Sequence, residues 1–200
     1  MPLRVFQMQT KRSNGFTMIE ALVIGVFTVL FATFLIVRFS ASQLHTDRLR
    51  FANLLAADIR DMQIWAATSR VLDSDGSLRC GYGIHRKDTK VFYLYAGPDV
   101  GDVECATHDR GYNEGGPQED TVIKTVNISD RSLRFPVDFP DIFFEPPDPK
   151  TFVCMTNPCD ADDTELNDPP GEIIIKNEGS ICPNNCTTIY VYTSGKIEVQ

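Results

Sequence analysis

Six cysteines are the residues of this 200-residue chain whose number and spacing most directly suggest chemistry. In an exported domain an even set of cysteines predicts a disulfide framework. Sequence alone leaves the connectivity open, and we favour local pairs because two of them bracket short turn-forming stretches that contain proline. The favoured pairs are Cys154 with Cys159, Cys182 with Cys186, and Cys80 with Cys105. The alternative is a zinc site, although the C-x4-C and C-x3-C spacings differ from the usual C-x2-C pattern.

Three histidines, His45, His85 and His108, are the other groups whose side chains suit catalysis. They lie far apart in the sequence, and none stands beside a nucleophile motif such as G-x-S-x-G. Isolated histidines are more often surface or core residues than catalytic ones. We therefore expect a protein that is not an enzyme, with no catalytic residue.

A single carboxylate, Glu20, interrupts an otherwise apolar stretch near the start of the chain. Phe16 to Val37 is 22 residues long, and its other polar side chains are three threonines. As a helix this stretch is about 33 Å long, against a hydrocarbon core of about 30 Å. A carboxylate this close to a membrane interior is costly and is normally kept only where it has a partner. The stretch therefore predicts one membrane span with a functional charge near its end.

Two ordinary kinds of apolar segment explain this stretch less well. A cleaved secretory signal has an apolar core of about 7–15 residues and a small-residue site after it, whereas Arg38-Phe39 follows here. A plain signal anchor fits the length but gives no reason for Glu20. The run Gly15-Phe16-Thr17-Met18-Ile19-Glu20, followed by an apolar helix, resembles the class III signal of type IV pilins and type II secretion pseudopilins.

This resemblance implies a processing step and a set of partners. A prepilin peptidase would cut between Gly15 and Phe16 and methylate the new amino group of Phe16. Glu20 would then pair with the Phe16 amine of a neighbouring subunit as the helices stack. The implied partners are prepilin peptidase, other pilin or pseudopilin subunits, an assembly platform protein with its ATPase, and membrane lipid before assembly. The absence of proline between Pro2 and Pro98 favours a minor pilin or pseudopilin, because major pilins often carry a helix-breaking proline in the span.

Charge sets the orientation of the chain and limits its partners. Arg4, Lys11 and Arg12 precede the span and favour a cytoplasmic amino terminus. We therefore expect a single-pass protein of the bacterial inner membrane with its carboxyl-terminal domain outside, and later in an extracytoplasmic filament. From Arg38 onward 16 Lys and Arg stand against 26 Asp and Glu, a net charge of −10. Such a surface disfavours binding to nucleic acid.

An acidic run near residue 160 is the candidate metal site. Its alternating carboxylates could wrap a calcium ion, and the resemblance adds that related major pseudopilins bind calcium in a loop of the globular domain. The candidate ligands are Asp160, Asp162, Asp163 and Glu165. Glu165 stands where an EF-hand loop needs glycine, and the alternative is a solvated acidic loop. We expect no other cofactor.

One long helix, residues 16–71, is expected to carry the span and to continue beyond it. The sequence has neither glycine nor proline between Val26 and Ser74, and the turn composition of Asp73 to Gly76 then ends the helix. A 3-4-3-4 spacing predicts a buried stripe of Ala52, Leu55, Ile59, Met62 and Ala66. The opposite face is expected to be solvated and consists of Arg48, Arg50, Asp58, Arg60 and Asp61.

Beyond residue 76 the period changes to two, which predicts strands. A hairpin is expected around Arg86 to Thr89, and Ser194-Gly195 is a tight-turn signal near the carboxyl end. Further strands are expected at residues 121–128, 132–135, 150–155, 172–176, 187–193 and 196–199, forming one mostly antiparallel sheet. Residues 96–120 are expected to form a surface loop tied by Cys105. Residues 136–149 carry five prolines and are expected at an edge or in an irregular crossing, not in a central strand.

These inferences combine into an α+β fold of the type IV pilin-like, lollipop-shaped kind. The expected parts are a leader at 1–15, a transmembrane helix half at 16–37, an amphipathic helix half at 38–71 and an exported disulfide-containing β domain at 72–200. The segment 80–94 also resembles the first hairpin of minor pseudopilins related to the H-type subunit of type II secretion. The expected function is a minor pilin or pseudopilin that is processed by prepilin peptidase and polymerises through its amino-terminal helix.

Two alternatives remain at this point. One is a membrane-anchored exported binding module that does not polymerise. The other is a DNA-uptake minor pilin, for which only scattered cations are available: Arg79, Arg86, Lys87 and Lys90.

Overall fold

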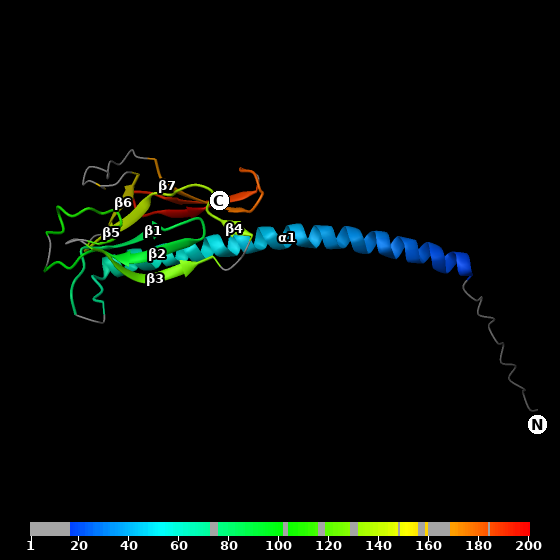
Figure 1. The fold of residues 1–200 in the computed structure, drawn as a ribbon, viewed down its shortest axis with the longest axis horizontal. Helices are drawn as coiled ribbons and strands as arrows, with labels where there is room; N and C mark the ends of the chain where they lie inside the picture. Colours follow the sequence, from blue (N-terminus) through cyan, green and yellow to red (C-terminus); the bar gives the residue numbers. More distant parts are fainter. Residues whose placement is uncertain are drawn as a thin grey trace, which may run out of the picture. The chain divides into compact units, whose positions relative to one another are not determined.

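The computed structural model describes residues 17–72, 76–101, 104–115, 119–128, 132–147, 149–155, 159, 169–183 and 185–200. Within these ranges the fold is α+β, with the helix α1 (Met18–Ala67) followed by strands that pair in two antiparallel sheets (Figure 1). The chain divides into two compact units, residues 1–43 and residues 44–200. Each unit is described by itself below.

The helix α1 ends earlier than its sequence predicts. The helix was expected to reach residue 71, with the turn from Asp73 to follow, but α1 stops at Ala67. Ser69 has a φ of 45°, so its N–H bonds the carbonyl of Ala66, and the N–H of Arg70 bonds the carbonyl of Trp65. This pair of bonds is the Schellman arrangement, which satisfies carbonyls that a helix end leaves without partners.

In the second unit the buried stripe of α1 is confirmed, and it is one residue longer than expected. Each of the five predicted residues from Ala52 to Ala66 is at most 1% exposed. Arg48, expected on the solvated face, is only 5% exposed, which corrects that expectation. It stands four residues before Ala52 and therefore continues the same 4-3-4-3 series onto the buried side.

The Arg48 guanidinium is buried because it has acceptors to satisfy it. Its Nε donates to the hydroxyl of Thr187 at 3.0 Å, and its Nη1 donates to the carbonyl of Asn185 at 2.6 Å and to Oδ1 of Asn177 at 3.4 Å. Burial lowers the pKa of Arg48 from its usual value. These bonds join α1 to the strands of the carboxyl-terminal sheet.

The first sheet has five strands in the order β3-β2-β1-β5-β6. Their bounds are β1 (Tyr82–Arg86), β2 (Val91–Ala96), β3 (Thr121–Asn127), β5 (Asp141–Glu145) and β6 (Lys150–Cys154). The β1–β2 pair is the predicted hairpin. The proline-rich segment was expected at an edge, yet β5 pairs with β1 on one side and β6 on the other. Asp141–Glu145 itself contains no proline, so its N–H groups are available to the sheet while the prolines flank it.

The second sheet has four strands in the order β4-β7-β8-β9, where one sheet had been expected. Their bounds are β4 (Leu133–Arg134), β7 (Gly171–Asn177), β8 (Cys186–Val191) and β9 (Ile197–Val199). The tight turn at Ser194-Gly195 is confirmed: the N–H of Gly195 bonds the carbonyl of Tyr192, and Gly195 has a φ of 79°. Positive φ costs glycine little, because it has no Cβ.

Both sheets contribute to one main core with the buried stripe of α1. The five-stranded sheet sends in alternate residues of β1, β2 and β5, and the four-stranded sheet sends in isoleucines and a valine of β7 and β8. A second, smaller cluster lies on the other face of the five-stranded sheet and contains Tyr95, Phe143, Phe152, Cys154 and Cys159. This division follows from the period of two along each strand.

The segment expected to be a surface loop, residues 96–120, is partly buried where it meets the smaller cluster. Arg110 is 4% exposed and His108 is 2% exposed. The buried hydroxyl of Tyr95 donates to the carbonyl of Arg110 at 2.9 Å, and the Arg110 side chain donates to Glu145 at 3.1 and 3.2 Å. The loop is therefore fastened over this face of the sheet by polar bonds and not only by its cysteine.

Candidate functional site

The apolar half of α1 is the first candidate site because its side chains are exposed. Met18–Ile36 is 19 residues long with a mean hydropathy of 2.5, and none of this segment is buried within the structure. Glu20 is its one charged residue. By length and composition the segment could cross a membrane, as an anchor or as a signal sequence.

Glu20 has a local role in the helix start that the sequence analysis missed. Its N–H donates to Oγ1 of Thr17 at 3.3 Å, while its Oε2 accepts from the N–H of Thr17 at 3.4 Å and from the Thr17 hydroxyl at 3.3 Å. This is a capping box, for which the T-x-x-E spacing is the sequence signal. A negative charge in the first turn of a helix also interacts favourably with the helix dipole. The capping box therefore explains Glu20 without a second subunit, while leaving the side chain exposed.

The processing residues Gly15 and Phe16 lie outside the described residues, so their expected cleavage stays a prediction. The same holds for the calcium candidates Asp160, Asp162, Asp163 and Glu165. Within the part of the chain that the structure describes, no three His, Cys, Asp or Glu side chains gather as a metal ion would require.

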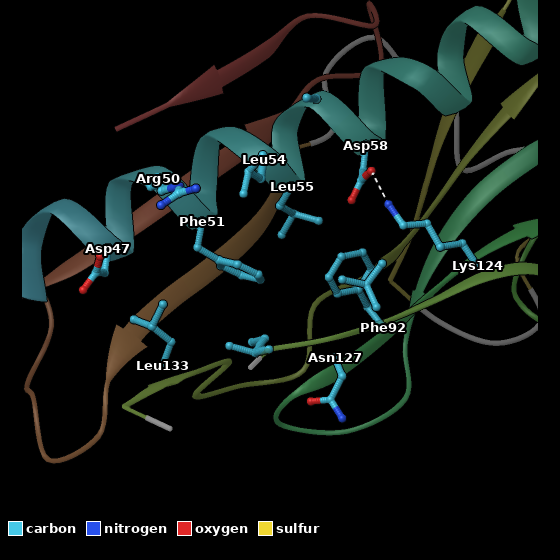
Figure 2. A pocket seen from close by; sticks show the side chains of 13 residues that line it. Asp47, Arg50, Phe51, Leu54, Leu55, Asp58, Phe92, Lys124, Asn127 and Leu133 are labelled. Atoms are coloured by element: carbon cyan, nitrogen blue, oxygen red, sulfur yellow. Dashed lines mark hydrogen bonds and ion pairs between the residues drawn. The ribbon is translucent and has the colours of Figure 1, made fainter. Parts of the chain in front are cut away.

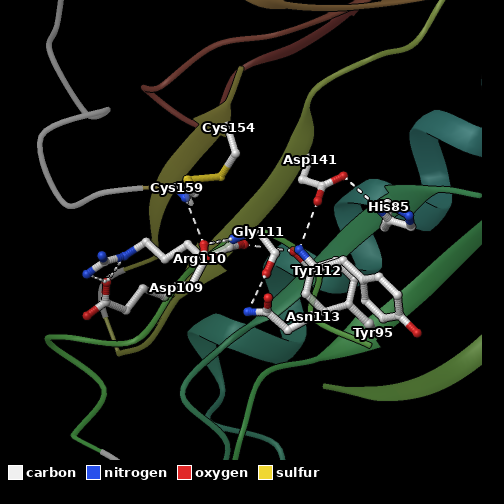
Figure 3. Close-up of a disulfide and its surroundings, with 11 residues drawn as sticks. His85, Tyr95, Asp109, Arg110, Gly111, Tyr112, Asn113, Asp141, Cys154 and Cys159 are labelled. Atoms are coloured by element: carbon white, nitrogen blue, oxygen red, sulfur yellow. Dashed lines mark hydrogen bonds and ion pairs between the residues drawn. A yellow bond between two sulfur atoms is a disulfide. The ribbon is translucent and has the colours of Figure 1, made fainter. Parts of the chain in front are cut away.

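The cysteines pair as the local scheme predicts. The structure contains the disulfides Cys80–Cys105, Cys154–Cys159 and Cys182–Cys186, and no cysteine is free. The zinc alternative is wrong for this structure, because a thiolate in a disulfide is not available as a ligand. Figure 3 shows Cys154–Cys159 next to Asp109, whose Oδ1 accepts the N–H of Cys159 at 2.8 Å and that of Gly111 at 2.9 Å.

The three histidines have separate surroundings. His45 is exposed on α1, and His108 is buried with Nδ1 2.7 Å from the carbonyl of Cys105. Burial lowers the pKa of His108. His85 of β1 lies with Nδ1 2.8 Å from Oδ1 of Asp141, and its ring stacks on that of Tyr112 at 4.6 Å between centroids (Figure 3).

Asp141 connects His85 to the buried part of the 96–120 segment. Its Oδ2 accepts the N–H of Tyr112 at 2.8 Å, so one carboxylate holds both a strand side chain and the loop backbone. The ring of Tyr112 also lies near the rings of Tyr95 at 5.3 Å and Tyr93 at 5.6 Å. This aromatic group on the outer face of the sheet brings together residues that the sequence analysis treated separately or not at all.

Beside this group lies a hollow of about 540 Å³ that we call the tyrosine pocket. It is lined by Tyr93, Tyr112, Glu114, Glu119, Asp120, Thr121, Val122 and Thr125. Register explains the strand contributions: Tyr93 of β2 pairs with Thr125 of β3, and an irregularity in the ladder pairs Tyr95 with Val122. Both pairs therefore present side chains to the same outer face, and the extra residue in β3 is a β-bulge.

Asp120 is the most buried carboxylate of the tyrosine pocket, with 5% of its surface exposed. Its Oδ2 accepts the N–H of Asn113 at 2.8 Å, and no hydrogen bond to Oδ1 occurs among the described residues. The pKa of Asp120 is raised to about 7, mainly by burial and also by the nearby Asp109 and Asp141, while the hydrogen bond from Asn113 lowers it. In the sequence, this site is marked only by an acidic residue at the end of the expected loop 96–120, directly before the expected strand 121–128.

A second hollow, of about 550 Å³, lies between α1 and β3 in the second unit (Figure 2). Phe51 and Leu55 of α1 and Phe92 of β2 line its apolar part. Nζ of Lys124 and Oδ1 of Asp58 are 2.9 Å apart and join the helix to the strand. Asp58 was expected on the solvated face, and it is partly buried at this ion pair.

The cations of the DNA-uptake alternative are largely engaged within the chain. Arg86 forms an ion pair with Asp138, Lys87 lies over the ring of Tyr93 and Arg79 donates to the hydroxyl of Thr121. These contacts do not favour a free basic patch, which phosphate binding requires.

Comparisons of the chain with models of protein families, with curated proteins and with solved structures give no match.

Proposed function

We propose that the chain is a subunit of a type IV pilin-like or type II secretion filament, of the minor pilin or pseudopilin kind. The observation that carries the proposal is the 50-residue helix α1, which begins with a 19-residue exposed segment that is apolar except for Glu20 and two threonines, and which buries later residues in a β-sheet core. An exposed apolar helix surface needs a second environment, which is lipid before assembly and other helices afterwards.

The proposed mechanism is polymerisation after processing. Prepilin peptidase removes residues 1–15, so that Phe16 carries the new, methylated amino group. The apolar half of α1 then leaves the inner membrane, driven by the platform protein and its ATPase, and packs against the helices of other subunits. Glu20 pairs with the amine of Phe16 in a neighbouring subunit, because an unpaired charge among apolar helices is costly. The acidic domain faces outward.

The capping box means that Glu20→Ala alone is an ambiguous test, since it removes both a cap and a charge. Glu20→Gln keeps the capping hydrogen bonds and removes only the charge, because glutamine serves equally in a capping box. Thr17→Ala removes the capping hydroxyl and keeps the charge, so it is the matched control. We expect Glu20→Gln to be processed normally but to give no filaments, while Thr17→Ala still assembles.

The measurements are mass spectrometry of the membrane-extracted protein and electron microscopy of sheared surface or overexpressed filaments. The mature wild-type protein should begin at a methylated Phe16. A wild-type amino terminus that stays at Met1 in a cell with prepilin peptidase would overturn the proposal. Filaments of Glu20→Gln at the wild-type level would instead assign Glu20 to the helix cap alone.

A second candidate is the membrane-anchored exported module that does not polymerise. The specific observation in its favour is the capping box, which gives Glu20 a role in an isolated helix. This candidate predicts that neither Glu20→Gln nor Thr17→Ala changes function, and that the wild-type protein forms no filaments.

A further inference from the structure

We propose that the tyrosine pocket binds an alkylammonium group, from a free amine or from a lysine side chain. The pocket combines aromatic rings of Tyr93 and Tyr112 with carboxylates of Glu114, Glu119 and Asp120. This inference does not rest on the proposed filament function, because every residue involved lies in the second unit.

The aromatic rings supply the first half of the recognition. The ring centroids of Tyr93 and Tyr112 are 5.6 Å apart and their planes are tilted by 58°, so the rings form two walls. His85 stacks on Tyr112, and the bond between Asp141 and the N–H of Tyr112 fixes the loop that carries the ring. Ring faces attract cations, by about 0.5–1 kcal/mol at exposed sites and more when the cation is desolvated.

The carboxylates supply the second half. Oδ2 of Asp120 accepts a hydrogen bond from the N–H of Asn113, and Oδ1 accepts no hydrogen bond among the described residues. A buried carboxylate with spare acceptor capacity gains from an ammonium donor, which also offsets the repulsion from Asp109 and Asp141. Glu114 and Glu119 add negative charge at the more open part of the pocket.

The chain itself contains an ammonium on one of these rings. Nζ of Lys87, in the β1–β2 turn, lies 4.9 Å from the ring centroid of Tyr93. The hydrogen bond to Tyr93 is the main cause that raises the pKa of Lys87, and Glu114 and Tyr112 contribute. The surface around Tyr93 therefore favours a cation, and Lys87 is a like-charged competitor for an external amine.

An ammonium ion suits this pocket better than a metal ion. Metals such as calcium need six to eight converging oxygen ligands, and no such group of side chains forms among the described residues. Two tyrosine rings offer no good metal ligand, whereas they contact the methylene groups next to an ammonium. The mixed apolar and acidic lining matches an alkyl chain that ends in a positive charge.

The test is calorimetric titration of the purified full chain in detergent with n-butylammonium chloride and with Nα-acetyl-lysine amide. Butan-1-ol controls for the alkyl chain, and sodium chloride at equal ionic strength controls for screening. We expect saturable binding of the amines, with Kd in the millimolar range, and none of the alcohol. Equal affinity for both amines would show that an alkylammonium group is sufficient for binding. Tighter binding of the lysine derivative would indicate that the pocket recognises lysine within a peptide.

Substitutions distinguish amine binding in the pocket from attraction to the acidic surface of the protein in general. Glu119→Gln should weaken amine binding at least about five-fold, which is about 1 kcal/mol. Glu172→Gln, at an exposed position of β7, makes the same charge change away from the pocket and should leave Kd unchanged. Lys87→Gln should strengthen binding, because it removes the competing cation.

Two substitutions of Tyr93 test whether amine binding requires the aromatic ring. Tyr93→Phe keeps the ring and should bind amines, whereas Tyr93→Leu should not, with circular dichroism to verify that both variants fold. Equal weakening by Glu119→Gln and Glu172→Gln would overturn the proposal, because it would show only attraction to an acidic surface. The absence of saturable binding in the wild-type chain would overturn it as well.

Discussion

Asp120 is a buried carboxyl group whose ionisation the fold disfavours. Burial and the neighbouring Asp109 and Asp141 raise its pKa, and the N–H of Asn113 opposes them only in part, so the value is about 7. In the unfolded chain the same group titrates near pH 4. Between these two values the folded chain holds a proton that the unfolded chain has lost.

From this difference we predict the sign of a pH effect. Stability contributed by Asp120 is present below about pH 4 and is lost as pH rises to about 7, because the unfolded state binds fewer protons in that window. Asp120→Asn cannot ionise, so its advantage over wild type should grow across the window to the order of a few kcal/mol. Urea unfolding of both proteins between about pH 4 and pH 8 checks this.

The comparison of the two proteins separates Asp120 from other titrating groups, such as the buried His108, because these are common to both. A difference in unfolding free energy that is independent of pH would contradict the raised pKa. A difference that grows toward low pH would contradict the sign.

At the scale of single elements, the part of α1 that lies in the second unit is held to the strands of that unit by more than its apolar stripe. Arg48 continues the stripe and donates to acceptors on the loop before β8, on β8 itself and on β7. A buried cation normally requires such partners. Arg48 therefore couples the helix to the edge of the core where the Cys182–Cys186 disulfide lies.

We predict that Arg48→Met destabilises the protein by about 2–4 kcal/mol, because it leaves three buried or partly buried acceptors without their donor. Arg50→Met is the matched control, since Arg50 is exposed two residues away on the same helix, and its effect should stay within about 0.5 kcal/mol. Denaturant unfolding of the purified full chain measures both. Equal effects of the two changes would show that the Arg48 bonds contribute nothing.

At the scale of the whole molecule, the three disulfides are confined to the second unit and differ in how much chain they close. Their sequence separations are 25, 5 and 4 residues for Cys80–Cys105, Cys154–Cys159 and Cys182–Cys186. Cys80–Cys105 closes the segment that contains β1 and β2, and with β2 the pocket residue Tyr93. The entropy that a disulfide removes from the unfolded chain grows with the size of the loop.

We predict that replacing Cys80 and Cys105 together by serine costs about 3 kcal/mol, and that replacing Cys182 and Cys186 costs clearly less. In the wild type all six sulfurs should resist alkylation until a reductant is added. Reduction should loosen the β-sheet unit while the apolar half of α1 stays helical. Mass spectrometry after alkylation and circular dichroism check these points, and a larger loss from the Cys182 and Cys186 pair would contradict the loop-entropy argument.

Local patterns in the sequence were enough to predict the apolar helix, the buried stripe from Ala52 to Ala66, the β1–β2 hairpin and the two short disulfides, Cys154–Cys159 and Cys182–Cys186. Each depends on residues that are close along the chain, or on a period of 3.6 or 2, so neighbouring side chains specify it. The T-x-x-E cap at Thr17 and Glu20 was also a local signal, although its meaning was missed.

The tertiary structure alone decided which distant segments meet. It placed β5 inside a sheet, divided the strands into two sheets, turned Arg48 inward and joined His85 to Asp141 across 56 residues of sequence. The tyrosine pocket has the same origin, because its rings and carboxylates come from β2 and from the segment between β2 and β3, while β3 adds other lining residues. Strand order and loop placement depend on how the whole core packs, and no local period encodes them.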